Sequence, residues 1–291
     1  MFLAVIEKAV PPLAPQELLV YQFLAVAMLA ISLVVYLRLF RRLAVRGPQT
    51  RPDLMALPEM LAGTVIMLLF GAVLFTRWFS PAAATSAAPE TAASLNQVLL
   101  VNMANLALPA IAIVVLLVAR GGHLQSVFGL HKVNATRVIG YGFCLAVLAI
   151  PLTYAAKVLT IRITGIQEAP QALVQKYHSA IVGNDAGLIG LIVLSACVVA
   201  PLSEELLFRG TFYPLLSRGF GRFVSAMVTA LLFSFVHDTY SDIPGLTILA
   251  LCFTLAYEVT GSLLVPIVMH ATFNSLSLFV MWWQIRNGLT P

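Results

Sequence analysis

Three short motifs in the second half of the sequence bring together side chains that could hydrolyse a peptide bond. The motifs are Glu204-Glu205-xxx-Arg209, Phe233-xxx-His237 and His270-xxx-Asn274. A carboxylate, helped by an imidazole, can take a proton from water, and imidazole or carboxamide N–H groups can donate to an oxyanion that forms on a carbonyl. These residue types therefore suit the transfer of an acyl group to water.

The spacing within the first motif gives its two glutamates different surroundings. Residues four apart on a helix share a face, whereas adjacent residues diverge by about 100°. Arg209 therefore lies over Glu205 and can neutralise it, while Glu204 points elsewhere without that partner. A carboxylate in apolar surroundings with no close cation suits a general base. The alternative is that both glutamates belong to one structural ion-pair network.

Two other kinds of chemistry could use these residues or their neighbours, namely a serine nucleophile and a zinc site. Ser203 and Ser234 adjoin the motifs, but neither has the helical spacing from a histidine that an activated nucleophile needs. Glu204, His237 and His270 could form a zinc site with two histidines and one glutamate, but no HExxH motif is present. We therefore expect no metal and no cofactor, with a zinc-dependent variant left open.

The composition shows what kind of fold must position these residues. The chain has 291 residues, of which 60% are hydrophobic and 10% charged, whereas soluble domains carry about 25% charged residues. Too few charges are available to cover a water-soluble surface, and the apolar runs are continuous rather than alternating, unlike those of a β-barrel. The fold class is therefore all-α, a polytopic transmembrane helical bundle. The three cysteines fall in apolar runs and are expected to be small buried side chains.

Eight stretches approach the roughly 20 apolar residues that a membrane helix needs. They are Leu18–Leu39, Leu54–Thr76, Val98–Ala119, Val138–Thr160, Ala186–Leu216, Arg222–His237, Pro244–Thr260 and Ser262–Ile285. Between the fourth and fifth, Ala169–Val182 places Leu173, Val174, Tyr177 and Ile181 on one helical face. This pattern predicts a surface helix that lies on the membrane or caps a cavity.

The distribution of Lys and Arg predicts the orientation. The first, third and fifth connections hold most of these residues, so the positive-inside rule places those connections in the cytoplasm. The net charge of +5 is explained in the same way, without nucleic acid as a partner. Tyr257 and Glu258 lie near the end of the seventh span. They could line the cavity or anchor the helix at the interface, and the anchor is the favoured expectation.

The helical rise then predicts the depth of each motif. If the fifth span continues to the basic turn at Arg218–Arg222, Glu204 lies roughly 20 Å from that turn and His237 roughly 22 Å. His270 lies roughly 12 Å deep and Asn274 roughly 18 Å by the same rise. Three helices thus bring a carboxylate, two imidazoles and a carboxamide to overlapping levels.

The ordered motifs resemble the type II CAAX prenyl endopeptidase family, also known as the CPBP or abortive-infection family. That family has EExxxR, FxxxH and HxxxN on successive helices, and all these positions match over Glu204–Asn274. The stretch Val127–Lys132 also resembles the segment that often precedes this core. The resemblance divides the chain into variable transmembrane helices over residues 1–137 and a catalytic transmembrane core over residues 138–291.

The resemblance implies an intramembrane endopeptidase in which Glu204 and His237 activate water and His270 with Asn274 forms the oxyanion site. Glu205, Arg209 and Phe233 would support that site. The expected partners are a peptide or membrane-protein substrate and the lipid bilayer, and the expected location is a prokaryotic cell membrane. Two rival functions stay open, namely a non-proteolytic immunity or scaffold protein and a transporter with a proton relay. The missing internal repeat disfavours the transporter.

Overall fold

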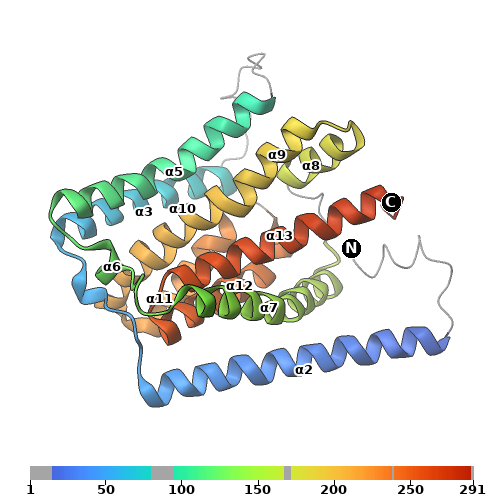
Figure 1. Cartoon of the computed structure of the whole chain (residues 1–291), viewed down its shortest axis with the longest axis horizontal. Helices are drawn as coiled ribbons and strands as arrows, with labels where there is room; N and C mark the ends of the chain where they lie inside the picture. Colours follow the sequence, from blue (N-terminus) through green and yellow to red (C-terminus); the bar gives the residue numbers. More distant parts are fainter. Residues whose placement is uncertain (1–14, 80–94, 167–171, 238, 290–291) are drawn as a thin grey trace.

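The computed structural model describes residues 15–79, 95–166, 172–237 and 239–289, and all regular structure in these ranges is helical (Figure 1). The first half contains α2 (Pro15–Arg46), η1 (Pro52–Leu54), α3 (Leu57–Phe79), α5 (Leu95–Ala119), α6 (Leu124–Val127) and α7 (Ala135–Thr164). The second half contains α8 (Ala172–Val182), α9 (Ala186–Leu194), η2 (Ser195–Val199), α10 (Ala200–Leu207), η3 (Phe208–Phe212), α11 (Tyr213–Phe235), η4 (Tyr240–Asp242), α12 (Ile243–Thr260) and α13 (Leu264–Arg286). The long helices follow the apolar runs, because a backbone in lipid must satisfy its own hydrogen bonds.

Within the described ranges, seven helical stretches are long and apolar enough to cross a membrane. One of them, Ala186–Phe235, joins the fifth and sixth predicted spans into a single stretch of 50 residues. Gly221 interrupts it with φ 73° and ψ 166°, a conformation that residues with a Cβ atom avoid. The fifth and sixth predicted spans lie on either side of this break, which reconciles the seven stretches with the eight predicted spans.

The polarity of the fold is that of an integral membrane protein. Large apolar side chains such as Phe23 and Val45 are exposed, whereas Glu205 and Arg209 are buried. This distribution follows from a lipid surround, which accepts apolar side chains and excludes charges. The expectation for cysteine holds for Cys252, which is buried, and is wrong for Cys144, which lies on the exposed surface of α7.

Helix α13, which carries the third motif, and helix α12 are packed against α7. Figure 1 shows α7, α12 and α13 side by side in the middle of the bundle, with α2 along one edge and α3 with α5 at the opposite edge. A Cβ atom on Gly142 of α7 would lie 2.5 Å from Val268 Cγ1 of α13. The missing side chain therefore lets these two helices approach closely, as small residues do between membrane helices.

The predicted surface helix is α8, and its apolar side packs against the bundle. Tyr177 and Ile181 are buried with Leu188 and Ile192 of α9 and Leu99 of α5. Burial raises the pKa of the Tyr177 hydroxyl above its ordinary value. The helical periodicity thus identified the correct face, and α8 covers one end of the bundle.

The expected interface anchors Tyr257 and Glu258 are instead buried near the end of α12, with 2% of each side chain exposed. That expectation was wrong because Glu258 has two partners from distant segments. Thr50 donates to Glu258 Oε1 at 2.6 Å, and Arg222 Nη1 donates to Glu258 Oε2 at 2.6 Å. This cluster ties the α2–α3 connection to α11 and α12.

Candidate active site

Two prolines shape the helical stretch that carries the first motif. A π-helical turn, η2, lies just before Pro201, and a second, η3, lies just before Pro214. In η2 the N–H of Ala200 donates to the carbonyl of Ser195, five residues earlier. Continuing that pattern, Ala196 would need the N–H of Pro201, which proline lacks. The carbonyl of Ala196 is therefore left without its backbone donor.

Asn274 supplies the missing donor. Its Nδ2 lies 2.7 Å from the Ala196 oxygen and donates a hydrogen bond to it, joining α13 to the turn in front of the first motif. A carboxamide nitrogen carries two hydrogens, so Asn274 keeps a second N–H as well as its carbonyl oxygen. Asn274 thus fixes the position of α10 and still has donor capacity for another group.

Glu205 and Arg209 form the buried pair that their spacing predicts. Arg209 Nη1 donates to Glu205 Oε1 at 2.8 Å, and Arg209 Nη2 donates to the Ala250 carbonyl at 2.8 Å. The Arg209 side chain is 1% exposed and the Glu205 side chain is 0% exposed. The guanidinium also lies over the rings of Phe233 and Phe253, 4.9 Å and 5.2 Å from their centroids. The cation is therefore held by a carboxylate, a carbonyl and two aromatic faces.

His270 lies between the two glutamates. Its Nδ1 is 3.0 Å from Glu205 Oε1, and its Nε2 is 3.9 Å from Glu204 Oε2. An ionised carboxylate only accepts, so Nδ1 carries the proton in the contact with Glu205. Phe253 stacks on the imidazole with ring centroids 5.0 Å apart. The ring orientation is thus set from two sides, and Nε2 faces Glu204.

Glu204 differs from Glu205 in the way the motif spacing predicts. Its side chain is 12% exposed, against 0% for Glu205. Among the described residues the Oε2 atoms of both glutamates are buried without a hydrogen-bond donor, but only Glu205 forms an ion pair with Arg209. The two Nη atoms of Arg209 donate to Glu205 and Ala250. Glu204 is therefore the carboxylate of the pair that can accept a hydrogen bond from water or substrate beside an imidazole.

His237 reaches the cluster through Phe233. Its ring lies 4.7 Å from the Phe233 ring, which in turn lies 5.8 Å from the ring of His270. The two imidazoles are therefore no farther apart than the sum of these distances. His237 Nδ1 contacts the Phe233 carbonyl at 2.7 Å. Since a carbonyl only accepts, Nδ1 carries the proton, and Nε2 of the neutral ring keeps a lone pair.

The structure brings most of the predicted residues into one cluster, with partners that differ in part from the expected ones. Arg209 and His270 each contact both Glu205 and Phe233, and Glu204 lies near His270. The sequence predicted overlapping depths for Glu204, His237 and His270, and it assigned Phe253 no role. Phe253 lies in α12, which carries none of the three motifs, so its spacing contained no signal.

The loop before α7 braces the turn that leads into α13. The N–H of Leu263 donates to the Phe128 carbonyl at 2.9 Å. Gly129, with φ 62°, lies so close to Gly261 that a Cβ atom on Gly129 would be 1.8 Å from the Gly261 oxygen. The stretch Val127–Lys132, singled out by its resemblance to a family segment, therefore positions the start of the helix that carries His270.

Part of the chain is similar to a known protein family. Residues 186–276 match the family described as "Type II CAAX prenyl endopeptidase Rce1-like". We refer to residues 186–276 as the Rce1-like core, after the family that they match. This core contains every residue of the three motifs and Phe253. It lies inside residues 138–291, and the boundary at residue 138 stays a prediction.

A relative of this chain is the Bacillus subtilis (strain 168) protein named "Putative membrane peptidase YdiL". It is 24% identical over 101 residues, which make up 35% of this chain and 41% of the relative. The match thus spans about two fifths of the curated relative. No solved structure significantly matches this chain.

The zinc-dependent alternative requires side chains that are arranged to bind a metal ion. Across residues 15–79, 95–166, 172–237 and 239–289, no group of three or more His, Cys, Asp or Glu side chains is arranged to hold a metal ion. In the Rce1-like core, His270 Nδ1 is bound to Glu205 and His237 Nδ1 to a carbonyl. Each imidazole thus keeps one nitrogen for a further partner.

Proposed function

We propose that this protein is an intramembrane endopeptidase in which Glu204 activates the attacking water. The observation that carries the proposal is the difference between the two adjacent glutamates. Glu205 is paired with Arg209 through Oε1, whereas no Lys or Arg of the described residues forms an ion pair with Glu204, whose Oε2 faces His270 Nε2 at 3.9 Å. Oε2 of each glutamate is buried without a hydrogen-bond donor in the described part of the chain. A water about 2.8 Å from each atom fits beside the line that joins them, so Glu204 can take its proton.

The hydrogen bonds of the two histidines support different roles for them. His237 donates from Nδ1, so its Nε2 lone pair can accept from water and help to hold it near Glu204. His270 is bound at Nδ1 to a carboxylate, and its Nε2 is the ring nitrogen that faces Glu204. We propose that an N–H at this Nε2 and the second N–H of Asn274 are the donors for the oxyanion. Glu205 and Arg209 act as positioning residues.

The proposed reaction forms no covalent bond between the protein and the substrate. Water adds to the peptide carbonyl as Glu204 takes its proton, and the carbonyl becomes an oxyanion bound by His270 and Asn274. Glu204 then returns the proton to the leaving amine as the C–N bond breaks. The family match and the bacterial relative support a peptidase in a prokaryotic cell membrane, with a peptide or membrane-protein substrate.

The decisive experiment measures cleavage by purified protein in lipid nanodiscs. The substrates are internally quenched peptides of mixed sequence, with and without a farnesylated C-terminal cysteine, and mass spectrometry identifies the products. Glu204→Gln should lower the rate by about 10²–10⁴-fold, the range for loss of a general base, and His237→Ala should also lower it. Asp53→Asn is the matched control, because Asp53 lies on the exposed surface and its variant should keep wild-type activity.

The alternatives give other results in the same assay. Undiminished cleavage by both Glu204→Gln and His237→Ala would refute the mechanism. Cleavage that is abolished by a strong chelator and restored by zinc would favour the zinc-dependent variant. A wild-type protein that cleaves none of the peptides would favour the immunity or scaffold function.

A further inference from the structure

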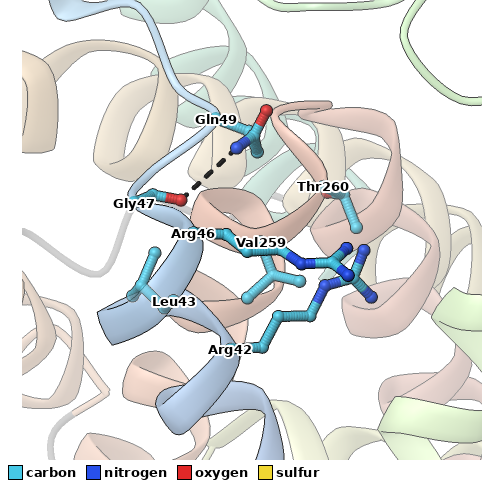
Figure 2. Close-up of a pocket in the computed structure, with 7 residues that line it drawn as sticks. All are labelled: Arg42, Leu43, Arg46, Gly47, Gln49, Val259 and Thr260. Carbon is cyan, nitrogen blue, oxygen red and sulfur yellow. Dashed lines mark hydrogen bonds between the residues drawn. The ribbon is translucent and has the colours of Figure 1, made fainter.

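A second polar feature lies at the end of α2, outside the candidate active site. Arg42, Leu43 and Arg46 line a pocket of about 210 Å³ together with Gly47, Gln49, Val259 and Thr260 (Figure 2). Arg42 and Arg46 are four residues apart and share a helix face. Figure 2 shows both guanidinium groups extending toward Thr260. Two like charges therefore converge on one pocket.

No acidic side chain in the described part of the chain neutralises these arginines. Within the described residues, neither guanidinium makes an ion pair or a side-chain hydrogen bond. Glu258, one residue before the pocket wall at Val259, already accepts from Arg222 and Thr50. A pair of converging cations that lacks a counter-ion inside the protein is suited to a ligand with negative charge.

The wall opposite α2 is held in place by the rest of the fold. The N–H of Gln49 donates to the Glu258 carbonyl at 2.9 Å, and Lys132 Nζ donates to the Gln49 carbonyl. Gln49 Nε2 donates to the Gly47 carbonyl at 3.3 Å, as Figure 2 shows. The pKa of Lys132 lies below its ordinary value, first because the amine is desolvated and then because Arg51 is near. The connection thus forms a fixed rim in a region of positive potential.

The same two arginines also face the lipid side of α2. A shallower hollow next to the pocket is lined by Arg41, Arg42, Val45 and Arg46. Val45 is 85% exposed, and Phe40, just before these arginines, is 56% exposed. An anionic headgroup in the pocket could therefore continue into acyl chains along the apolar surface of α2. The charge bias of the loops places this end of α2 in the cytoplasm, where anionic lipids gather.

We propose that the pocket between the end of α2 and the end of α12 binds the phosphate of an anionic phospholipid through Arg42 and Arg46. Planar guanidinium groups bind phosphate oxygens through paired hydrogen bonds, and basic pockets between membrane helices bind lipid headgroups in this way. This site is separate from the Glu204 cluster, and the inference does not depend on the proposed peptidase activity.

The test measures lipid binding by the full chain purified in a neutral detergent. Dioleoyl phosphatidylglycerol or dioleoyl phosphatidylcholine is added, and native mass spectrometry gives the dissociation constant of the bound lipid. We expect the phosphatidylglycerol to bind more tightly. Arg42→Gln and Arg46→Gln should each weaken its binding about fivefold, and the double variant about 25-fold. Arg38→Gln removes the same charge one turn earlier on an exposed position that lines neither hollow, so it should leave binding unchanged.

Two outcomes would overturn the proposal. Equal phosphatidylglycerol binding by the wild-type protein and the double variant would refute the site. The second outcome is that inorganic phosphate at millimolar concentration displaces phosphatidylglycerol and raises the unfolding temperature as much as the lipid does. The ligand of the pocket would then be free phosphate and not a lipid. Because Arg42 and Arg46 are exposed, the double variant should keep the unfolding temperature of the lipid-free wild-type protein, which separates lost binding from lost folding.

Discussion

Removal of either charge from the Glu205–Arg209 pair leaves the other charge buried without a counter-ion. Arg209 Nη1 and Glu205 Oε1 are 2.8 Å apart, and with an effective dielectric constant of about 20 their attraction is about 6 kcal/mol before desolvation is subtracted. Breaking such a pair by removing one partner destabilises proteins by about 3–5 kcal/mol. We therefore expect Arg209→Met and Glu205→Gln each to lower the free energy of unfolding by about 3–5 kcal/mol. The double variant buries neither charge of the pair. Its loss in free energy of unfolding should therefore be smaller, by at least about 2 kcal/mol, than the sum of the losses of the two single variants.

The assay is reversible unfolding by sodium dodecyl sulfate in mixed bicelles, followed by circular dichroism, for the four proteins of this double-mutant cycle. The exposed pair Arg51–Asp53 provides the control, since its Nη2 and Oδ2 atoms are 3.0 Å apart but the side chains are 60% and 61% exposed. Solvent screens that pair, so Arg51→Gln and Asp53→Asn should show far weaker coupling. The reasoning fails if the losses of Arg209→Met and Glu205→Gln simply add, or if their coupling is no larger than that of the exposed pair.

Two further predictions concern the loop before α7. Gly129→Ala should lower the free energy of unfolding by at least about 1–3 kcal/mol more than Gly121→Ala, because both positions have positive φ but the new Cβ would collide with the Gly261 carbonyl only at Gly129. The same bicelle assay compares them, and equal losses would contradict the close contact. Since burial and Arg51 lower the pKa of Lys132, its amine should lose its proton at lower pH than an ordinary lysine. The rate of Lys132 acetylation, followed by peptide mass spectrometry, should therefore reach half its maximum at a lower pH than the rate for a lysine in an unstructured peptide. An equal or higher pH of half-maximal rate would contradict the lowered pKa.

The contacts that the sequence could predict are those within one helix. The Glu205–Arg209 pair follows from a spacing of four residues, and the buried face of α8 follows from helical periodicity. Contacts between helices depend on tilt, rotation and local changes of helical pitch, which the helical rise alone does not contain. The depth estimate therefore separated Glu204 from His270 by roughly 8 Å along the membrane normal, whereas in the structure their side chains are 3.9 Å apart.

The contact of Asn274 with Ala196 illustrates the limit more closely. Pro201 is visible in the sequence, and proline is known to remove a helical hydrogen bond. The sequence does not reveal which side chain, on which of the other helices, replaces that bond. The answer requires α13 to lie beside η2 with Asn274 at the same level, and this is a property of the packed bundle.

The local pairing of Glu205 with Arg209 also bears on how the chain enters the membrane. A helix that carries both charges four residues apart presents the insertion machinery with a neutralised pair, which is less costly to transfer into lipid than two separate ions. His270, the other partner of Glu205, is synthesised 65 residues later. The Glu205–Arg209 pair can therefore be accommodated in the bilayer on its own, and the complete cluster assembles after α13 has been inserted. A nascent chain that stops short of the last helix would carry both glutamates without the imidazole that joins them.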